Sequence, residues 1–89
     1  MRGIIATTNE GYTIIEAAYI DTNHGYVIGK SKNNYVTWDF RERGDEIDFN
    51  HGHYIWIDPD SPARSKAKAY ADFHERLAKR YRELVEYGY

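Results

Sequence analysis

The chain has 89 residues, a formal net charge of −2 and no cysteine. A chain this short buries only about 60–65% of its unfolded surface, so we expect one domain, residues 1–89, with a modest core. The lack of cysteine excludes a disulfide framework and a thiolate metal cluster. No stretch approaches the roughly 20 apolar residues of a membrane span, and the N-terminus lacks the pattern of a signal peptide. We therefore expect a cytoplasmic protein that does not associate with membranes.

Charge and aromatic residues are distributed unevenly. Residues 1–60 hold 5 Lys and Arg against 10 Asp and Glu, whereas residues 61–89 hold 7 against 4. The chain also has nine tyrosines and two tryptophans. A small core cannot enclose so many large rings, and exposed Tyr and Trp are frequent at binding interfaces. Some of these rings should therefore lie on the surface.

The first sixty residues alternate β-type segments with clusters of turn residues. Segments rich in Val, Ile, Thr and aromatic residues, separated by Gly, Asn and Asp, are typical of hairpins. The pattern predicts five strands within residues 2–58, namely 3–7, 12–20, 26–30, 35–40 and 47–57. Since every connection is short, successive strands should pair antiparallel as a meander.

A helix is predicted from about residue 62 to residue 87. Apolar residues recur there at steps of three and four, as on one face of a helix. Ser61 can cap the start, Pro62 suits the first helical position, and Gly88 suits the end. At 1.5 Å per residue such a helix spans about 39 Å, against about 20–27 Å for a strand of six to eight residues. It should overhang the sheet near residues 81–89, which leaves a homodimer through the C-terminal helix open.

The expected fold is α+β, a five-stranded antiparallel β-meander with one long C-terminal helix packed across one face. A sheet covered on one side leaves its other side open to solvent. Alternation places Val36, Trp38 and Phe40 on one face of their strand. We expect this set to lie under the helix, with Tyr35 and Thr37 on the open face.

His51 and His53 flank Gly52 in the last predicted strand. Two imidazoles on one face can chelate zinc, and with Arg41 and Arg43 they can serve a small histidine-dependent ribonuclease. Regular alternation would instead bury both histidines beside Ile47 and Phe49. A bulge at Gly52 removes that conflict, because an extra residue changes which face follows. We expect the bulge, with no metal, no cofactor and no catalytic residue.

The predicted helix also carries basic residues interleaved with tyrosines. This combination can follow a phosphate backbone, so a nucleic-acid-binding accessory protein is a second hypothesis. Its binding residues would be Arg64, Lys68, Lys79 and Arg82.

Several segments resemble a group of small proteins carried by conjugative elements, plasmids and phages of gut Firmicutes. The matching pieces are Thr13-Ile14-Ile15-Glu16, Val27-Ile28-Gly29, Tyr35-Val36-Thr37-Trp38, Gly52-His53-Tyr54 and, more loosely, "ADFHER" at residues 71–76. Members usually have an aromatic residue at the position of His51, so the His-x-His pair is not a feature of the group. The resemblance implies an accessory protein of a mobile genetic element, and such proteins include anti-CRISPR and other anti-defence inhibitors.

The leading hypothesis is a binding module without enzymatic activity that acts by surface contact. Its partner would be a host or element-encoded protein, such as a defence nuclease. Because Tyr, Trp and Arg most often anchor protein interfaces, the predicted binding residues are Tyr35, Arg41, Arg43, His53, Tyr54 and Trp56.

Overall fold

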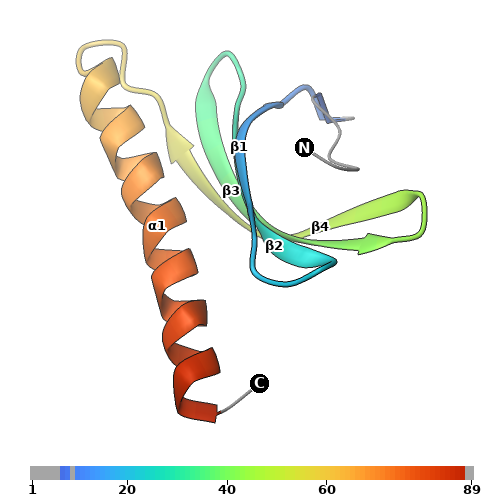
Figure 1. Ribbon diagram of the computed structural model, residues 1–89. Helices are drawn as coiled ribbons and strands as arrows, with labels where there is room; N and C mark the ends of the chain where they lie inside the picture. Colours follow the sequence, from blue (N-terminus) through green and yellow to red (C-terminus); the bar gives the residue numbers. More distant parts are fainter. Residues whose placement is uncertain (1–6, 9, 88–89) are drawn as a thin grey trace.

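The computed structural model describes residues 7, 8 and 10–87. Within them, four strands precede one helix, in the order β1 (Thr13–Tyr19), β2 (His24–Lys30), β3 (Asn34–Arg43), β4 (Glu46–Trp56) and α1 (Pro62–Tyr87). The strands form one antiparallel sheet in chain order, β1-β2-β3-β4, with α1 across one face (Figure 1). No helix of the described residues is long and apolar enough to cross a membrane.

The α+β class, the antiparallel meander and the C-terminal helix agree with the predicted fold, but the number of strands does not. The sheet has four strands rather than five in the described part of the chain. Most of the strand predicted over residues 3–7 lies outside the described residues. Its last residue, Thr7, forms only an isolated bridge to Thr13, on the strand that follows.

Both faces of the sheet carry an apolar core. The side away from the helix buries Tyr12, Ile14, Val27, Val36, Trp38 and Phe40. The side under the helix buries the smaller set Ile28, Tyr35, Ala69 and Phe73. The predicted assignment of faces is therefore wrong, since Trp38 and its neighbours turn away from α1 and Tyr35 and Thr37 turn toward it.

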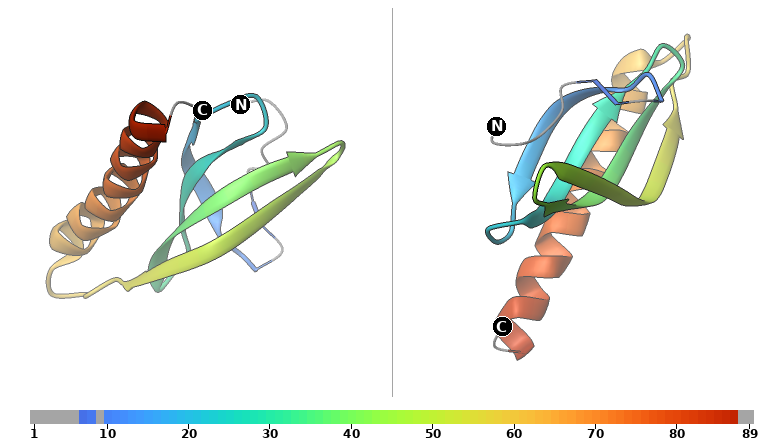
Figure 2. Two further views of the ribbon diagram at one scale, coloured as in Figure 1. Left: turned by 90° about the horizontal axis from the view of Figure 1, so that it is seen from below. Right: turned by 90° about the vertical axis from the view of Figure 1, so that its right-hand side faces the viewer.

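The curl of the sheet explains this reversal. The sheet bends away from the helix, and the long β3–β4 hairpin curves round with it (Figure 2). A curled sheet can bury its concave face against itself, whereas the prediction assumed a flat sheet with one solvated face. Aromatic rings fill this inner core: Tyr12 and Trp38 meet edge to face at 5.4 Å between centroids, and Tyr19 and Phe40 do so at 5.1 Å.

A β-bulge in β4 accompanies the curl. Two residues of β4, His51 and Gly52, lie opposite the single residue Trp38 of β3. His51 is the residue that adopts the left-handed backbone conformation, with φ 55°. The bulge predicted at Gly52 is confirmed, although the residue beside the glycine takes the strained conformation.

The bulge reverses the direction in which alternate side chains of β4 point. Before it, Ile47 and Phe49 pack against the inner core. After it, Ile55 packs under the helix and Tyr54 meets Trp38 on the inner side, at 6.5 Å between ring centroids. Gly52 is required for this contact, because a Cβ there would lie 2.8 Å from Tyr54 Cε2 and 2.9 Å from Trp38 Nε1.

The start of α1 lies beside the end of β4. The Ser65 amide donates to the Ser61 carbonyl, and the Ser65 hydroxyl accepts from the Asp58 amide at 2.9 Å, which ties the connecting loop to the first helical turn. At its other end α1 runs past the sheet (Figure 1), and Tyr81, Val85 and Tyr87 are exposed. The overhang is confirmed as far as Tyr87, and the predicted stop at Gly88 lies outside the described residues.

We predict that Gly52→Ala lowers the free energy of unfolding by about 1–3 kcal/mol, the usual cost of overpacking. The added methyl would press on the rings of Tyr54 and Trp38, and the nearly buried Trp38 has little room to move. Urea unfolding measures the loss. Asn50→Ala, at an exposed position of the same strand, is the matched control and should change stability by less than about 0.5 kcal/mol. Equal midpoints for the two variants would contradict this account of Gly52.

Candidate functional site

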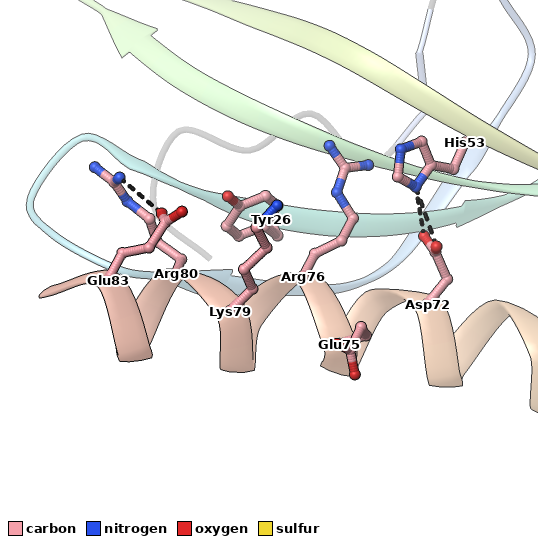
Figure 3. Close-up of a pocket in the computed structure, with 8 residues that line it drawn as sticks. All are labelled: Tyr26, His53, Asp72, Glu75, Arg76, Lys79, Arg80 and Glu83. Atoms are coloured by element: carbon pink, nitrogen blue, oxygen red, sulfur yellow. Dashed lines mark hydrogen bonds and ion pairs between the residues drawn. The ribbon is translucent and has the colours of Figure 1, made fainter. Parts of the chain in front are cut away.

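Two grooves border the helix. The first, here called the polar groove, has a volume of about 490 Å³ and lies between α1 and the helix-facing side of the sheet. Figure 3 shows its side chains, most of which rise from α1 toward β2 and the strands beyond it. They are Tyr26, His53, Asp72, Glu75, Arg76, Lys79, Arg80 and Glu83.

Thr37 joins two helix side chains of the polar groove, Asp72 and Arg76, in one hydrogen-bond network. It is fully buried, and its hydroxyl donates to the carboxylate of Asp72. Arg76 Nη1 donates to the Thr37 hydroxyl and to the Thr37 carbonyl, each at 3.0 Å. Arg76 also lies 3.7 Å from Asp39 and places its guanidinium over the ring of Tyr26, 5.3 Å from the centroid. Asp72 and Arg76, which are typical of an exposed i,i+4 pair, instead both bind the sheet.

The two histidines have separate partners. His51 Nδ1 pairs with Asp39, and His53 Nδ1 lies 3.0 Å from Asp72. The two imidazoles therefore bind different carboxylates. Among the described residues, no three or more His, Asp or Glu side chains are grouped so as to hold a metal ion.

Most polar side chains of the polar groove thus form hydrogen bonds, ion pairs or cation–π contacts with one another. Burial raises the pKa of the Tyr26 hydroxyl, and the nearby Arg76 guanidinium opposes this effect. A hydrogen-bonded, partly desolvated network of this kind favours one arrangement of helix and sheet. We interpret the Thr37 network as the polar fastening of α1 to the sheet.

His24, at the start of β2, is a further polar group in a partly buried position. Its Nδ1 is buried without a hydrogen-bond partner. Burial lowers the pKa of His24, and the nearby Arg41 and Arg80 lower it further, while Asp21 and Asp39 oppose them. Protonating this imidazole in the folded protein is therefore unfavourable.

The second groove lies where β4 ends and α1 begins. We call it the Trp56 groove. It has a volume of about 360 Å³ and is lined by Ile55, Trp56, Asp58, Ser61, Arg64, Ser65 and Lys68. Trp56 is 65% exposed, although it is the largest apolar side chain in the groove. Two basic side chains, Arg64 and Lys68, line the same groove from the first turns of the helix.

The structure separates the residues predicted to form one binding surface. Tyr54 and Trp56 lie two residues apart near the end of β4, and both are exposed. Tyr35 is only 5% exposed and packs under α1, so its predicted place on an open face is wrong. The reason is again the curl, which makes the helix side of β3 the smaller core.

Arg41 and Arg43 lie at the opposite end of the β3–β4 hairpin. Arg43 pairs with Glu46 in the ladder and binds Asp48 at 2.9 Å. Nine residues of β4 separate Glu46 from Trp56, which places them roughly 30 Å apart along an extended strand. His53 points toward α1 and lines the polar groove. The predicted set is therefore not one surface.

The basic helix residues are also divided. Arg64 and Lys68 line the Trp56 groove, Lys79 lines the polar groove, and Arg82 lies 3.7 Å from Glu75. Sequence reasoning named Trp56, Arg64 and Lys68 but assigned them to different hypotheses. The short loop over residues 57–61, with its Asp58 and Ser61 turn, is the signal that brings them together.

Comparison with protein-family models, with curated proteins and with solved structures finds no match to this chain.

We predict that Thr37→Val lowers the free energy of unfolding by about 1–3 kcal/mol. Valine keeps the shape but leaves Asp72 and Arg76 without the buried hydroxyl that joins them. The urea midpoint should fall while the slope of the transition stays unchanged. Thr13→Val, at an exposed position of β1, is the control. If Thr37→Val is as stable as the control, the network does not fasten the helix.

The lowered pKa of His24 predicts a loss of stability on acidification. The unfolded chain takes up a proton near the ordinary histidine pKa of about 6.5, whereas folded His24 does so only at lower pH. As the pH falls below about 6.5, the unfolded state therefore binds more protons, which lowers its free energy relative to that of the folded state. Melting temperatures at about pH 7.5 and about pH 5 should differ less for His24→Gln than for the unchanged protein. The same difference in both proteins would show that His24 has no part in it.

Proposed function

We propose that this protein is a non-enzymatic binding module that holds a partner protein at the Trp56 groove and the adjacent Tyr54. The observation that carries the proposal is that Trp56, which is 65% exposed, lines one groove with Arg64 and Lys68. Tryptophan is a frequent binding hot spot, worth about 2 kcal/mol or more when a partner buries it.

The neighbouring rings support a rigid contact surface. Tyr54 is 56% exposed, yet its ring lies against Trp38 and, at 6.3 Å between centroids, against Tyr12. A side chain that is already held in place loses little conformational entropy on binding. Tyr54 is therefore suited to serve as a second anchor beside Trp56.

The charges of the groove indicate the chemistry of the partner. Arg64 and Lys68 outnumber the single carboxylate of Asp58 among the lining residues. We propose that the partner presents an apolar side chain to Trp56 and carboxylates to the two cations. The resemblance to mobile-element proteins favours a cytoplasmic host or element-encoded protein as the partner, such as a defence nuclease inhibited in the manner of an anti-CRISPR protein.

Single-stranded nucleic acid is the second candidate ligand, and the same groove favours it. A base can stack on an exposed ring while its phosphates meet Arg64 and Lys68. The carboxylate of Asp58 in the groove and the net charge of −2 oppose phosphate binding. We therefore rank it below a protein partner.

A histidine-dependent ribonuclease has the least support. His51 and His53 each pair with their own aspartate, and the aspartate of His53, Asp72, also accepts from the fully buried Thr37 hydroxyl. Both imidazoles are exposed, but these pairings favour a structural role for them over catalysis.

We predict that the double variant Trp56→Ala with Lys68→Glu loses partner capture, because it removes the apolar anchor and reverses a groove charge. The tagged protein would be used to capture proteins from a lysate of a gut Firmicutes host, before and after nuclease treatment. Ile15→Ala, at an exposed apolar position on β1, is the matched control and should capture the same protein as the unchanged chain.

A gel-shift assay with a single-stranded oligonucleotide separates the two candidates. Capture that resists nuclease, with no gel shift at low salt, supports a protein partner. A shift that weakens steeply with salt and disappears in the double variant would instead favour nucleic acid. Unchanged capture by the double variant would remove the Trp56 groove from both hypotheses.

A further inference from the structure

The helix α1 carries a second stripe of apolar and small residues that is separate from the one packed on the sheet. The sheet side includes the fully buried Ala69 and Phe73. The second stripe follows alternating steps of four and three residues and consists of Ala67, Ala71, His74, Ala78, Tyr81 and Val85. We call it the outer seam.

The outer seam is exposed along most of its length. Val85 is 84% exposed and Tyr81 is 51% exposed, the two largest apolar side chains of the seam. Ala67, Ala71 and His74 are exposed as well, and only Ala78 is partly buried. A solvated helix face normally carries charged residues, so an exposed row of this composition is unpaired apolar surface.

The spacing of the seam suits a second helix. Alternating steps of three and four residues keep one row of side chains directed at a neighbouring helix and are the seam positions of a coiled coil. The small Ala78 lies at the middle of the overhanging half and allows two helix axes to approach closely there, while Tyr81 and Val85 supply bulk on its C-terminal side. From residue 67 to residue 85 the seam is about 27 Å long.

The charges beside the seam point to the occupant. Along the solvent-side flank, at steps of seven residues, the charge alternates between positive Lys68, negative Glu75 and positive Arg82. In an antiparallel pair of identical helices centred near residue 79, Glu75 of each copy lies beside Arg82 of the other. Two-fold symmetry makes this contact twice.

A parallel pair lacks this complementarity, because the same flank would face Tyr70 and Leu77 of the other copy. The antiparallel alignment also sets Tyr81 against the small Ala78 and places Val85 near His74. Figure 2 shows α1 running beyond the sheet, so an overlap centred on the overhang leaves the two sheets at opposite ends.

We propose that the outer seam binds a second copy of this chain, as an antiparallel helix pair with two-fold symmetry. The seam is short, so the dimer belongs to the weak, concentration-dependent class of interfaces, below about 1,200 Å². Within one chain Glu75 and Arg82 already approach to 3.7 Å, but both are exposed, so exchanging this contact for one across the interface costs little.

Sedimentation equilibrium of the purified chain over roughly a hundredfold range of concentration tests the dimer. The expected result is a mass that rises toward two chains, and a Val85→Asp variant that stays a single chain at every concentration. Asn50→Asp adds the same charge at an exposed position of β4 and should dimerise as the unchanged chain does. Circular dichroism of each variant establishes that it is folded.

The orientation has its own test. Glu75→Arg alone and Arg82→Glu alone each place two like-charged pairs across the antiparallel interface, so each should weaken the dimer. Mixing the two variants restores opposite charges at both contacts and should recover the dimer at least to the level of the unchanged chain. A parallel pair would show no such recovery.

A single-chain mass for the unchanged protein at every concentration would overturn the proposal, as would dimerisation of Val85→Asp. Failure of the mixture to recover would overturn the antiparallel arrangement. None of these results depends on a partner at the Trp56 groove, so they test the dimer independently of the proposed function.

Discussion

The contact of Trp38 with two residues of β4 is the constraint on which the rest of the structure depends. Because His51 and Gly52 share the place of one residue, every side chain after them changes face. Phe49 before the bulge and Tyr54 after it can then both meet Trp38 inside the curled sheet. Ile55 is left to pack under the helix. Without the extra residue, one of these two cores would lose its β4 side chains.

Because this sheet has a core on each face, the few apolar residues of the chain are shared between two cores. Under α1 only a few buried side chains remain, chiefly Ile28, Ala69 and Phe73. The buried Thr37 hydroxyl, with Asp72 and Arg76, adds directional contacts where apolar area is limited. Such contacts contribute modestly to net stability but are costly to leave unmade, so they select one position of the helix on the sheet.

The helix and most of the strands could be predicted because their signals are local. Pro62 and the three- and four-residue spacing define α1, and Gly52 marks the bulge. The faces of β3 could not be predicted, since Tyr35, Val36, Thr37 and Trp38 are all buried and alternation gives no polar side. The outer seam could not be predicted for a related reason. Ala67 and Tyr81, which belong to the seam, fit the same three- and four-residue steps as Phe73, which packs on the sheet. Trp56 was recognisable as a site residue, but its meeting with Arg64 and Lys68 depends on the reversal over residues 57–61.

The order of the strands has a consequence for the way this chain folds. Within the described residues, each of the four strands pairs only with a strand that is its neighbour in the sequence. Loop closure between neighbours costs little entropy, and sheets built this way fold faster than sheets with distant pairings. Each hairpin can therefore form as soon as its second strand has been synthesised. The inner core, built from residues 12–54, can close before α1 is complete, which shortens the time during which its many aromatic rings are open to aggregation.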